Sequence, residues 1–441
     1  MEIVGIGYCS RLATQVSDGD SPKVARVNAC GQSRLALLIV LTTHPIQYQV
    51  PLWQALAADG RVPFEVWFMT DHGVRESLDR EFGRAFAWDL NLLSGYPSRS
   101  LEVAPGASPS SFWKCRLRER LRTRLVSSGA SALWIQGWQV AAYWQAVWEA
   151  RAAGVPIWLR GESNCLAPTQ GWKRPMKRLL LGWLFRQVAQ FLYIGSANRD
   201  LYRTCGVPES KLQSTPYAVD NDRFARHASD LRPQRADLRR RWAIPEGAFC
   251  VLFCGKFIPK KRPMDLVEAA RRWNADRSLP KIHLLFVGSG ELDANLRSAC
   301  FEATGSGISP EAASQELPPA TFAGFLNQTE VAQAYCAADC LALPSDHGET
   351  WGLVANEAMA SGLPCVVSNK CGCAQDLLRD LDSRLRFQCG NIEELLAALK
   401  SVLHHCPAPS ELAAAIDRHH IRVTIETVVG LFALNEASRA S

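Results

Sequence analysis

Short apolar runs alternate with longer stretches of helical periodicity along most of the chain. Runs of strand length occur five times in each half, at 35–41, 64–69, 132–136, 156–160, 191–195, 250–255, 283–288, 321–324, 340–344 and 365–368. Strands that are apolar throughout, with helices between them, are typical of parallel sheets covered on both faces. The pattern therefore predicts an α/β protein with two Rossmann-like domains that face each other across a cleft.

A turn-rich segment separates the two sets of strands. It contains Gly206-Val207-Pro208 and Asp220-Asn221-Asp222, and residues of these types favour turns. A chain of 441 residues also exceeds one ordinary domain and suits two. We therefore expect one domain at 35–215, a second at 216–413 and closing helices at 414–441.

Two carboxylates bracket a loop and a helix start in the second half. Glu349 lies in the loop after the strand at 340–344, and Glu357 lies in a helix expected at 354–360. A helix that begins near Gly352 presents unpaired N–H groups to an anion, and Glu357 tilts back toward that end. Since carboxylates accept bonds from sugar hydroxyls, the segment predicts a site for a sugar carried on a diphosphate. The alternative is that Glu349 only caps the helix and Glu357 is a solvated surface residue.

Cations and glycines follow other strands of the same half. Lys256 and Lys261 lie five residues apart before a helix expected from about Met264, where they could hold a diphosphate. The alternative is a generic basic turn. Gly288-Ser289-Gly290 is either a turn beside a nucleotide or a plain tight turn.

Several segments, in the same order, resemble the retaining family-four glycosyltransferases. The motif from Glu349 to Glu357, with seven residues between the two carboxylates, resembles the signature of that family. The segments His44–Tyr48, Tyr217–Asp220 and Gly324–Gln328 also resemble family segments. The similarity covers about residues 35–440.

The resemblance implies the GT-B fold, with an acceptor domain first, a nucleotide-sugar donor domain second, and the final helix, near 425–438, packing back on the first domain. It implies that Glu349 holds the sugar, Glu357 the ribose or sugar hydroxyls, and Lys256 with Lys261 the diphosphate. The expected donor-binding positions are Gly255, Gly288, Gly290, Phe325, Leu326, Thr350, Gly352, Leu353, Val354 and Glu357. Family members usually carry an arginine where this chain has Lys256, so charge is kept but bidentate geometry is lost.

The acceptor side gives a weaker signal. His44 follows the first strand and could assist deprotonation of an acceptor, although a histidine beside a proline also suits a packed or capping role. Glu162 follows another strand and is a comparable candidate. The Gly-Gly loop that many family members have near His44 is absent from this chain.

Composition indicates a reduced, cytoplasmic protein without a cofactor. No apolar run reaches the ~18–20 residues of a membrane span, and residues 1–34 carry Asp18, Asp20 and Lys23 where a signal peptide needs an apolar stretch. We expect those residues to form a tail. Fifteen cysteines in apolar contexts suit core thiols, and none has zinc-site spacing. No Asp-x-Asp follows a predicted strand in a suitable loop, so a metal-independent reaction is expected.

Basic residues cluster in the first half, although the net charge is only +6. At 114–124, six cations accompany one acid, and Leu117, Leu121 and Leu125 predict the inner stripe of a helix. The segment at 172–190 has five cations, no acid and many apolar residues. These segments suit contact with anionic lipids or with an anionic acceptor, or they are solvated faces over core helices. No nucleic-acid-reading motif is present.

The sequence thus predicts a retaining hexosyltransferase, acting from a nucleotide diphosphate sugar on a saccharide or lipid-linked acceptor, as in polysaccharide biosynthesis. Another GT-B enzyme, such as a nucleotide-sugar epimerase or a phosphorylase, is the first alternative. A non-catalytic GT-B partner subunit is the second. The expected partners are the donor, the acceptor and the inner face of an anionic membrane, without nucleic acid.

Overall fold

The computed structural model describes residues 36–74, 77–79, 84–166, 173–302 and 317–440. The described residues from Ala36 onward belong to one compact unit. The expected tail at 1–34 lies outside the described residues.

Seven parallel strands form the sheet of the first half, with the two apolar faces that the sequence predicts. Their order across the sheet is β5 (Ser98–Ser100), β2 (Phe64–Phe68), β1 (Leu37–Thr42), β6 (Ala130–Ile135), β7 (Ile157–Leu159), β8 (Gln190–Tyr193) and β9 (Leu212–Ser214). Along β1, Leu38 and Val40 enter one core cluster while Ile39 and Leu41 enter another. Because alternate residues of a strand face opposite ways, burial of both sets explains the uninterrupted apolar run.

Helices cover both faces of this sheet, and a small hairpin accompanies it. The helices are α1 (Val50–Asp59), α2 (Leu121–Ser128), α3 (Ala141–Ala152), α4 (Lys173–Phe185) and α5 (Ser196–Thr204). The hairpin consists of β3 (Ser77–Asp79) and β4 (Arg84–Phe86).

A second sheet of seven parallel strands forms the other half. Its order is β12 (Phe301–Glu302), β13 (Pro319–Gly324), β11 (Ile282–Val287), β10 (Phe249–Cys254), β14 (Cys340–Leu343), β15 (Cys365–Ser368) and β16 (Arg386–Phe387). The helices are α6 (Asn221–Leu231), α7 (Arg235–Arg241), α8 (Pro263–Ala275), α9 (Asp293–Ala299), α10 (Val331–Ala337), α11 (Leu353–Ala360), α12 (Ala374–Leu377), α13 (Ile392–His404) and α14 (Pro409–Asp417). The predicted class, with two parallel sheets, is confirmed.

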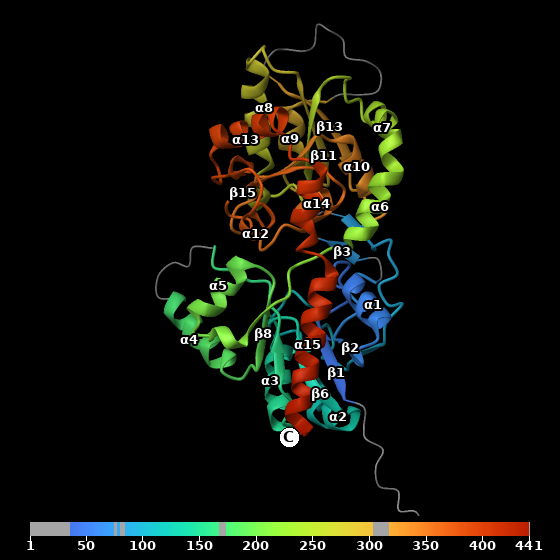
Figure 1. Ribbon diagram of the computed structural model, residues 1–441, viewed down its shortest axis with the longest axis vertical. Helices are drawn as coiled ribbons and strands as arrows, with labels where there is room; N and C mark the ends of the chain where they lie inside the picture. The colour runs from blue at the N-terminus through green and yellow to red at the C-terminus, as the bar shows by residue number, and fades with distance from the viewer. Residues whose placement is uncertain (1–35, 75–76, 80–83, 167–172, 303–316, 441) are drawn as a thin grey trace, which may run out of the picture. The chain divides into compact units, whose positions relative to one another are not determined.

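The last helix, α15 (Ile421–Ala440), belongs to the end of the chain but packs on the first half. It contacts α1 and β6, beside which it runs in Figure 1. Val428 and Phe432 enter the same core cluster as Leu38 and Val40 of β1. The Asn435 side chain also donates to the Ser131 carbonyl at 3.0 Å. The final helix therefore completes the core under one face of the first sheet.

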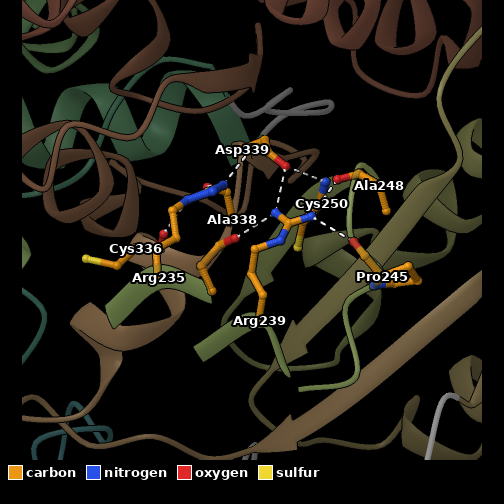
Figure 2. A network of polar contacts seen from close by, with 9 residues as sticks. Arg235, Arg239, Pro245, Ala248, Cys250, Cys336, Ala338 and Asp339 are labelled. Atoms are coloured by element: carbon orange, nitrogen blue, oxygen red, sulfur yellow. Dashed lines mark hydrogen bonds and ion pairs between the residues drawn. The ribbon is translucent and has the colours of Figure 1, made fainter. Parts of the chain in front are cut away.

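One polar network fastens α7 to the amino ends of the second sheet (Figure 2). Asp339, just before β14, accepts from Arg235 at 2.6 Å, from Arg239 at 3.1 Å and from the Cys250 backbone N–H at 2.8 Å. The same arginines donate to carbonyls at the end of α10 and before β10. A hollow of about 520 Å³ lies beside them. Because carbonyls and Asp339 already engage the guanidinium groups, we read this network as structural.

The ten predicted strands are all confirmed, with bounds shifted by a few residues. The predicted helical stripe at 117–125 is wrong in its first turn, because α2 begins only at Leu121. Leu117 is buried but lies in extended backbone that bridges to Val103. No helix among the described residues is long and apolar enough to cross a membrane.

Candidate functional site

A cavity of about 430 Å³ opens at the carboxyl ends of β10, β11, β13 and β14. Gln47, Tyr48 and Trp88 line it from the first half. The second half contributes Cys254, Gly255, Lys256, Lys260, Lys261, Val287, Gly288, Phe325, Leu326, Gln328, Val331, Gly348, Glu349, Thr350, Val354 and Glu357. Ligands of parallel α/β sheets bind at this end of the strands. The cavity therefore collects ten of the fifteen residues that the sequence predicted for the site.

Glu349 and Lys261 form an ion pair at the cavity. The Lys261 ammonium bonds to Glu349 Oε2, and the two side chains are only 17% and 14% exposed. Burial alone would lower the pKa of Lys261, but the Glu349 charge and hydrogen bond outweigh it, so the pKa is raised. Lys261 therefore stays protonated, and Glu349 is held in the cavity by a lysine from the neighbouring strand end.

Gly352 makes the helix start possible. Its φ of +105° lies in the region that favours glycine, and a Cβ there would come within 2.6 Å of Leu343 Cδ2. The residue is the N-cap of α11, where no side chain caps the helix. The Glu349 carboxylate bonds to Lys261 and Ser345 and not to this helix start, which contradicts the capping alternative. Gly352 and Leu353 shape the helix start and are not among the residues that line the cavity.

Glu357 is buried at the bottom of the site, with 1% of its surface exposed. Its carboxylate accepts from the Tyr335 hydroxyl and, at 3.3 Å, from Gln328 Nε2. Burial raises the pKa of Glu357, against these hydrogen bonds, which lower it. Arg223 donates to the Gln328 side-chain oxygen at 2.8 Å and so fixes the amide. A solvated surface role for Glu357 is wrong, because only 1% of the residue is exposed.

Three lysines border the cavity rather than the two that the sequence singled out. Lys256 and Lys261 were expected, and Lys260 joins them. The short helix Pro259–Lys261 places Lys260 and Lys261 next to the 346–349 loop, since the Lys260 carbonyl accepts from the Asp346 N–H at 2.8 Å. The adjacent loops thus bring three positive charges to one opening.

Close backbone contact explains the glycines after β10 and β11. A Cβ on Gly288 would lie 1.9 Å from the Gly255 carbonyl oxygen, and one on Gly290 would lie 2.6 Å from that of Phe257. The Phe257 N–H donates to the Ser289 carbonyl at 2.9 Å. Gly255 and Gly288 reach the cavity, but Gly290 does not line it. For Gly290, a tight turn between two packed loops accounts for the residue.

The turn after β13 joins the two halves at the mouth of the cavity. Phe325 lies 6.3 Å from Trp88, measured between ring centroids. Asn327 Nδ2 donates to the Ala87 carbonyl at 3.0 Å, and the Thr329 backbone N–H donates to Asp89 at 3.1 Å. The loop of the first half that carries Trp88 is therefore held against the second-half wall of the cavity.

His44 lies outside the cavity lining. It is half-buried, its Nδ1 is 2.9 Å from the Thr43 hydroxyl, and its ring packs edge-on against His72 at 5.3 Å. Burial, and then the His72 charge, lower the pKa of His44 to about 4. The imidazole is therefore neutral at pH 7, and its neighbours favour the packed role that the sequence left open.

Glu162 is also separate from the cavity lining. Its carboxylate accepts from the Tyr217 hydroxyl at 2.5 Å, and the buried Arg160 guanidinium lies 5.0 Å from the Tyr217 ring. Next to it, Asn164 Nδ2 donates to the Thr350 carbonyl at 2.9 Å. Residues 160–164 therefore position Tyr217 and the Glu349 loop.

Nine lining residues of the cavity were not among the fifteen predicted ones: Gln47, Tyr48, Trp88, Cys254, Lys260, Val287, Gln328, Val331 and Gly348. Tyr335, which donates to Glu357, was not predicted either. Lys260 stands directly before the predicted Lys261, and Gln328 stands in a segment already singled out. Trp88 and Tyr335 carried no sequence signal, because only the packing of distant segments brings them to the site.

Residues 234–418 match the family described as glycosyl transferases group 1. A D-inositol 3-phosphate glycosyltransferase from Geodermatophilus obscurus is 32% identical over 227 residues, 50% of this chain and 46% of that protein. A GDP-mannose-dependent alpha-mannosyltransferase from Mycobacterium tuberculosis is 28% identical over 260 residues, 58% and 60% of the two chains. The chain thus spans 46% to 60% of the length of these two relatives.

Solved structures share the fold at low identity. HepE of Anabaena, in complex with UDP and glucose, superposes with a TM-score of 0.62 at 15% identity, over 90% of this chain and 99% of that one. The α,α-trehalose 6-phosphate synthase of Burkholderia multivorans gives 0.64 at 14%, over 92% and 98%. Residues 234–418 of the chain are thus similar to the glycosyl transferases group 1 family, and the chain shares the fold of these solved structures.

Proposed function

We propose that the protein is a retaining glycosyltransferase that moves a hexose from a nucleotide diphosphate sugar to a saccharide or lipid-linked acceptor. One observation carries the proposal: Lys256, Lys260 and Lys261 share a single cavity with Glu349 and Glu357. Cations suit the diphosphate and carboxylates suit hydroxyls, so both parts of a sugar nucleotide have partners there.

The main task of the site is to stabilise the negative charge that develops on the leaving group. As the bond from the anomeric carbon to the diphosphate breaks, negative charge grows on the departing oxygen. The acceptor hydroxyl oxygen bonds to the same carbon, and its proton leaves with the diphosphate or with water. Fixed positive groups that already face the diphosphate stabilise that charge without reorganisation. In the proposal, the lysines and the start of α11 have this role, and Glu349 holds the sugar.

Glu357 is proposed to hold ribose or sugar hydroxyls. Its position supports this, because the carboxylate lines the cavity while Tyr335 and Gln328 fix its direction. Burial raises the pKa of Glu357 and so disfavours its ionised form. A sugar or ribose hydroxyl that donates a hydrogen bond to this carboxylate would stabilise the ionised form.

We also propose that the reaction proceeds without a metal ion, since protein cations can serve the diphosphate. The two Asp-x-Asp pairs within the described residues have other partners. Asp220 accepts from the Arg223 N–H at 2.9 Å and Asp222 lies 3.3 Å from His420, while Asp382 caps a short helix. We expect a chelator to leave the transferase activity unchanged, and added divalent cations not to increase it.

Release of nucleoside diphosphate from a donor tests the assignment. A thermal-shift panel of UDP, GDP and ADP sugars should first identify the donor, because binding to the folded state raises Tm. Lys261→Ala and Glu349→Gln should then slow turnover by about 10²–10³-fold. Lys281→Ala, an exposed lysine outside the cavity, should leave the rate unchanged. Well-folded Lys261→Ala and Glu349→Gln variants with the wild-type rate would refute the roles proposed for these two residues.

The dependence on acceptor distinguishes the proposal from its rivals. A transferase releases nucleoside diphosphate in step with acceptor, and a product with the donor's anomeric configuration identifies retention. Release without acceptor indicates an epimerase-like enzyme. If no sugar nucleotide raises Tm, the result indicates a non-catalytic partner subunit.

A peripheral contact with an anionic membrane surface is also proposed. Its support is charge: Lys114, Arg116 and Arg118 are exposed in one basic segment, and Arg178 and Arg186 in the other. The side chains of Lys173, Arg174 and Lys177 lie outside those described. Each cation near an anionic surface contributes about 1 kcal/mol at low salt.

A further inference from the structure

Five aromatic side chains form a strip on the first half, in which four rings are exposed and the central one, Trp144, is partly buried. Their rings touch in the order Trp113, Phe112, Trp144, Trp183 and Trp148, with centroid distances of 4.8, 6.4, 6.4 and 4.9 Å. Trp113 is 69% exposed, Trp148 47%, Trp183 40% and Phe112 36%. The strip crosses from the segment before α2, over α3, to α4. Contiguous apolar surface of this kind usually marks an interaction site.

Helix α4 extends the strip with two leucines. Leu179 is 77% exposed and Leu180 52%, and both stand one helical turn before Trp183. The opposite side of the helix is already used, because Leu181, Leu184 and Phe185 are buried in the core. A surface helix normally has one apolar face and one polar face. The exposed face made by Leu179, Leu180 and Trp183 of α4 therefore suits an apolar partner.

Positive charge flanks the aromatic strip. Lys114 and Arg116 follow Trp113, and the Arg116 guanidinium lies 5.1 Å from the Trp113 ring centroid. Arg178 and Arg186 flank the exposed turn of α4, and both are exposed. The nearest acid in sequence, Glu149, is half-buried and accepts from the Arg122 backbone N–H at 2.9 Å. Cations thus flank the strip at two points along the chain.

We propose that this aromatic strip inserts into the interfacial layer of an anionic phospholipid membrane. Indole rings combine an apolar body with an N–H group and favour the headgroup level, where leucines reach the acyl chains and arginines meet phosphates. A second copy of the chain would bring like charges together across the strip, so the charge pattern favours lipid. The inference rests on the proposed peripheral contact and adds insertion to charge attraction.

Vesicle sedimentation tests the surface. Wild-type protein should bind vesicles of phosphatidylcholine with 30% phosphatidylglycerol, and the Leu179→Glu/Leu180→Glu variant should bind at least tenfold more weakly. Leu434→Glu is the matched control, because Leu434 is a 68% exposed helical leucine on α15. It should bind like the wild type. Equal binding of both variants, or no wild-type binding at low salt, would overturn the inference.

Bromine on the lipid chains distinguishes insertion from attraction. Brominated phosphatidylcholine in the vesicles should quench the tryptophan fluorescence of the wild type, and the Trp113→Phe/Trp148→Phe variant should lose much of that quenching. Binding that disappears in 0.5 M salt without any quenching would leave charge attraction alone and reject insertion.

Two further measurements keep the outcomes separate. Sedimentation velocity would reveal a dimer, and dimerisation abolished by Leu179→Glu would assign the strip to a second copy and reject the membrane. The Tm shift with a sugar nucleotide should be the same in all these variants, because the cavity is untouched. A variant that loses membrane binding but keeps a normal Tm shift therefore tests only the membrane inference. A wild-type protein without a Tm shift would contradict the proposed function instead.

Discussion

Single side chains decide how the cavity treats a ligand, and Glu357 is the clearest case. Glu357→Gln removes a buried charge while keeping an oxygen that can accept from Tyr335. We expect Tm to stay the same or rise, and the rise to grow with pH, because burial raises the pKa of Glu357 and ionisation opposes folding. The donor KM should increase about tenfold, since a charge-assisted bond is lost.

Tyr335→Phe is the control for this prediction. It leaves the carboxylate without one of its donors and should cost about 1–3 kcal/mol of stability at pH 7. Chemical denaturation and initial rates measure the two effects. A Glu357→Gln variant with lower Tm and unchanged donor KM would mean that the carboxylate is structural rather than a hydroxyl acceptor.

At the scale of elements, the start of α11 depends on one glycine. Gly352→Ala introduces a Cβ at 2.6 Å from Leu343 Cδ2 and a φ of +105° that alanine disfavours. We expect a loss of about 1–3 kcal/mol and a larger relative loss of activity, because Glu349 and Glu357 flank this turn. Gly247→Ala is the matched control: its φ is +72°, but a Cβ there meets nothing within 4 Å. It should keep full activity.

The network of Asp339 leads to the opposite prediction for α7. Asp339→Asn weakens two arginine pairs and a bond to the Cys250 N–H, all at the amino ends of the strands. We expect a loss of about 2 kcal/mol in unfolding free energy with activity unchanged at temperatures where the protein is folded. Asp237→Asn breaks an exposed pair with Arg240 on the same helix and should cost far less. Equal losses in urea denaturation would contradict a structural role for the network.

Elements buried on both faces were the predictable part of this chain. The central strands, such as β1 and β10, are apolar throughout because both faces are covered. An uninterrupted apolar run in the sequence therefore reveals them. Edge strands of two or three residues, such as β12 and β16, carry no such signal. The repeat of Leu117, Leu121 and Leu125 predicted one helix, but tertiary pairing with Val103 holds Leu117 in extended backbone. Periodicity cannot distinguish a buried leucine of a helix from one of an adjoining bridge.

The site residues also divide into those that the sequence could predict and those that it could not. Glu349, Lys261 and Glu357 stand in local motifs, so the sequence located them, and the structure shows that their loops meet. Trp88 and Tyr335 reach the site through contacts between segments far apart in the chain. His44 and Glu162 follow strands as expected but have partners in His72 and Tyr217. A strand end narrows the candidates, but only packing decides which side chain faces the cavity.

The whole molecule should lose stability in mild acid, because its buried histidines resist protonation in the folded state. His283 is fully buried on β11, with Nε2 3.0 Å from the Thr321 oxygen, and burial lowers its pKa to about 4. Between pH 6.5 and 4 the unfolded chain therefore binds a proton that the folded chain excludes, so stability falls as pH falls. For His283 the loss should reach about 2 kcal/mol at pH 5.

Burial also lowers the pKa of His44 and His419 to about 4, so both act in the same direction, whereas Glu357 and Asp376, whose pKa values are raised, act in the opposite one. His283→Leu isolates one contribution, because leucine cannot take up the proton. Its unfolding free energy should fall less steeply than that of the wild type from pH 7 to pH 5, whatever its stability at pH 7. His404→Leu, at the end of α13 with its side chain exposed, should keep the wild-type slope. Parallel slopes for wild type and His283→Leu would show that His283 is protonated in the folded protein, and acid sensitivity would then have to come from other groups.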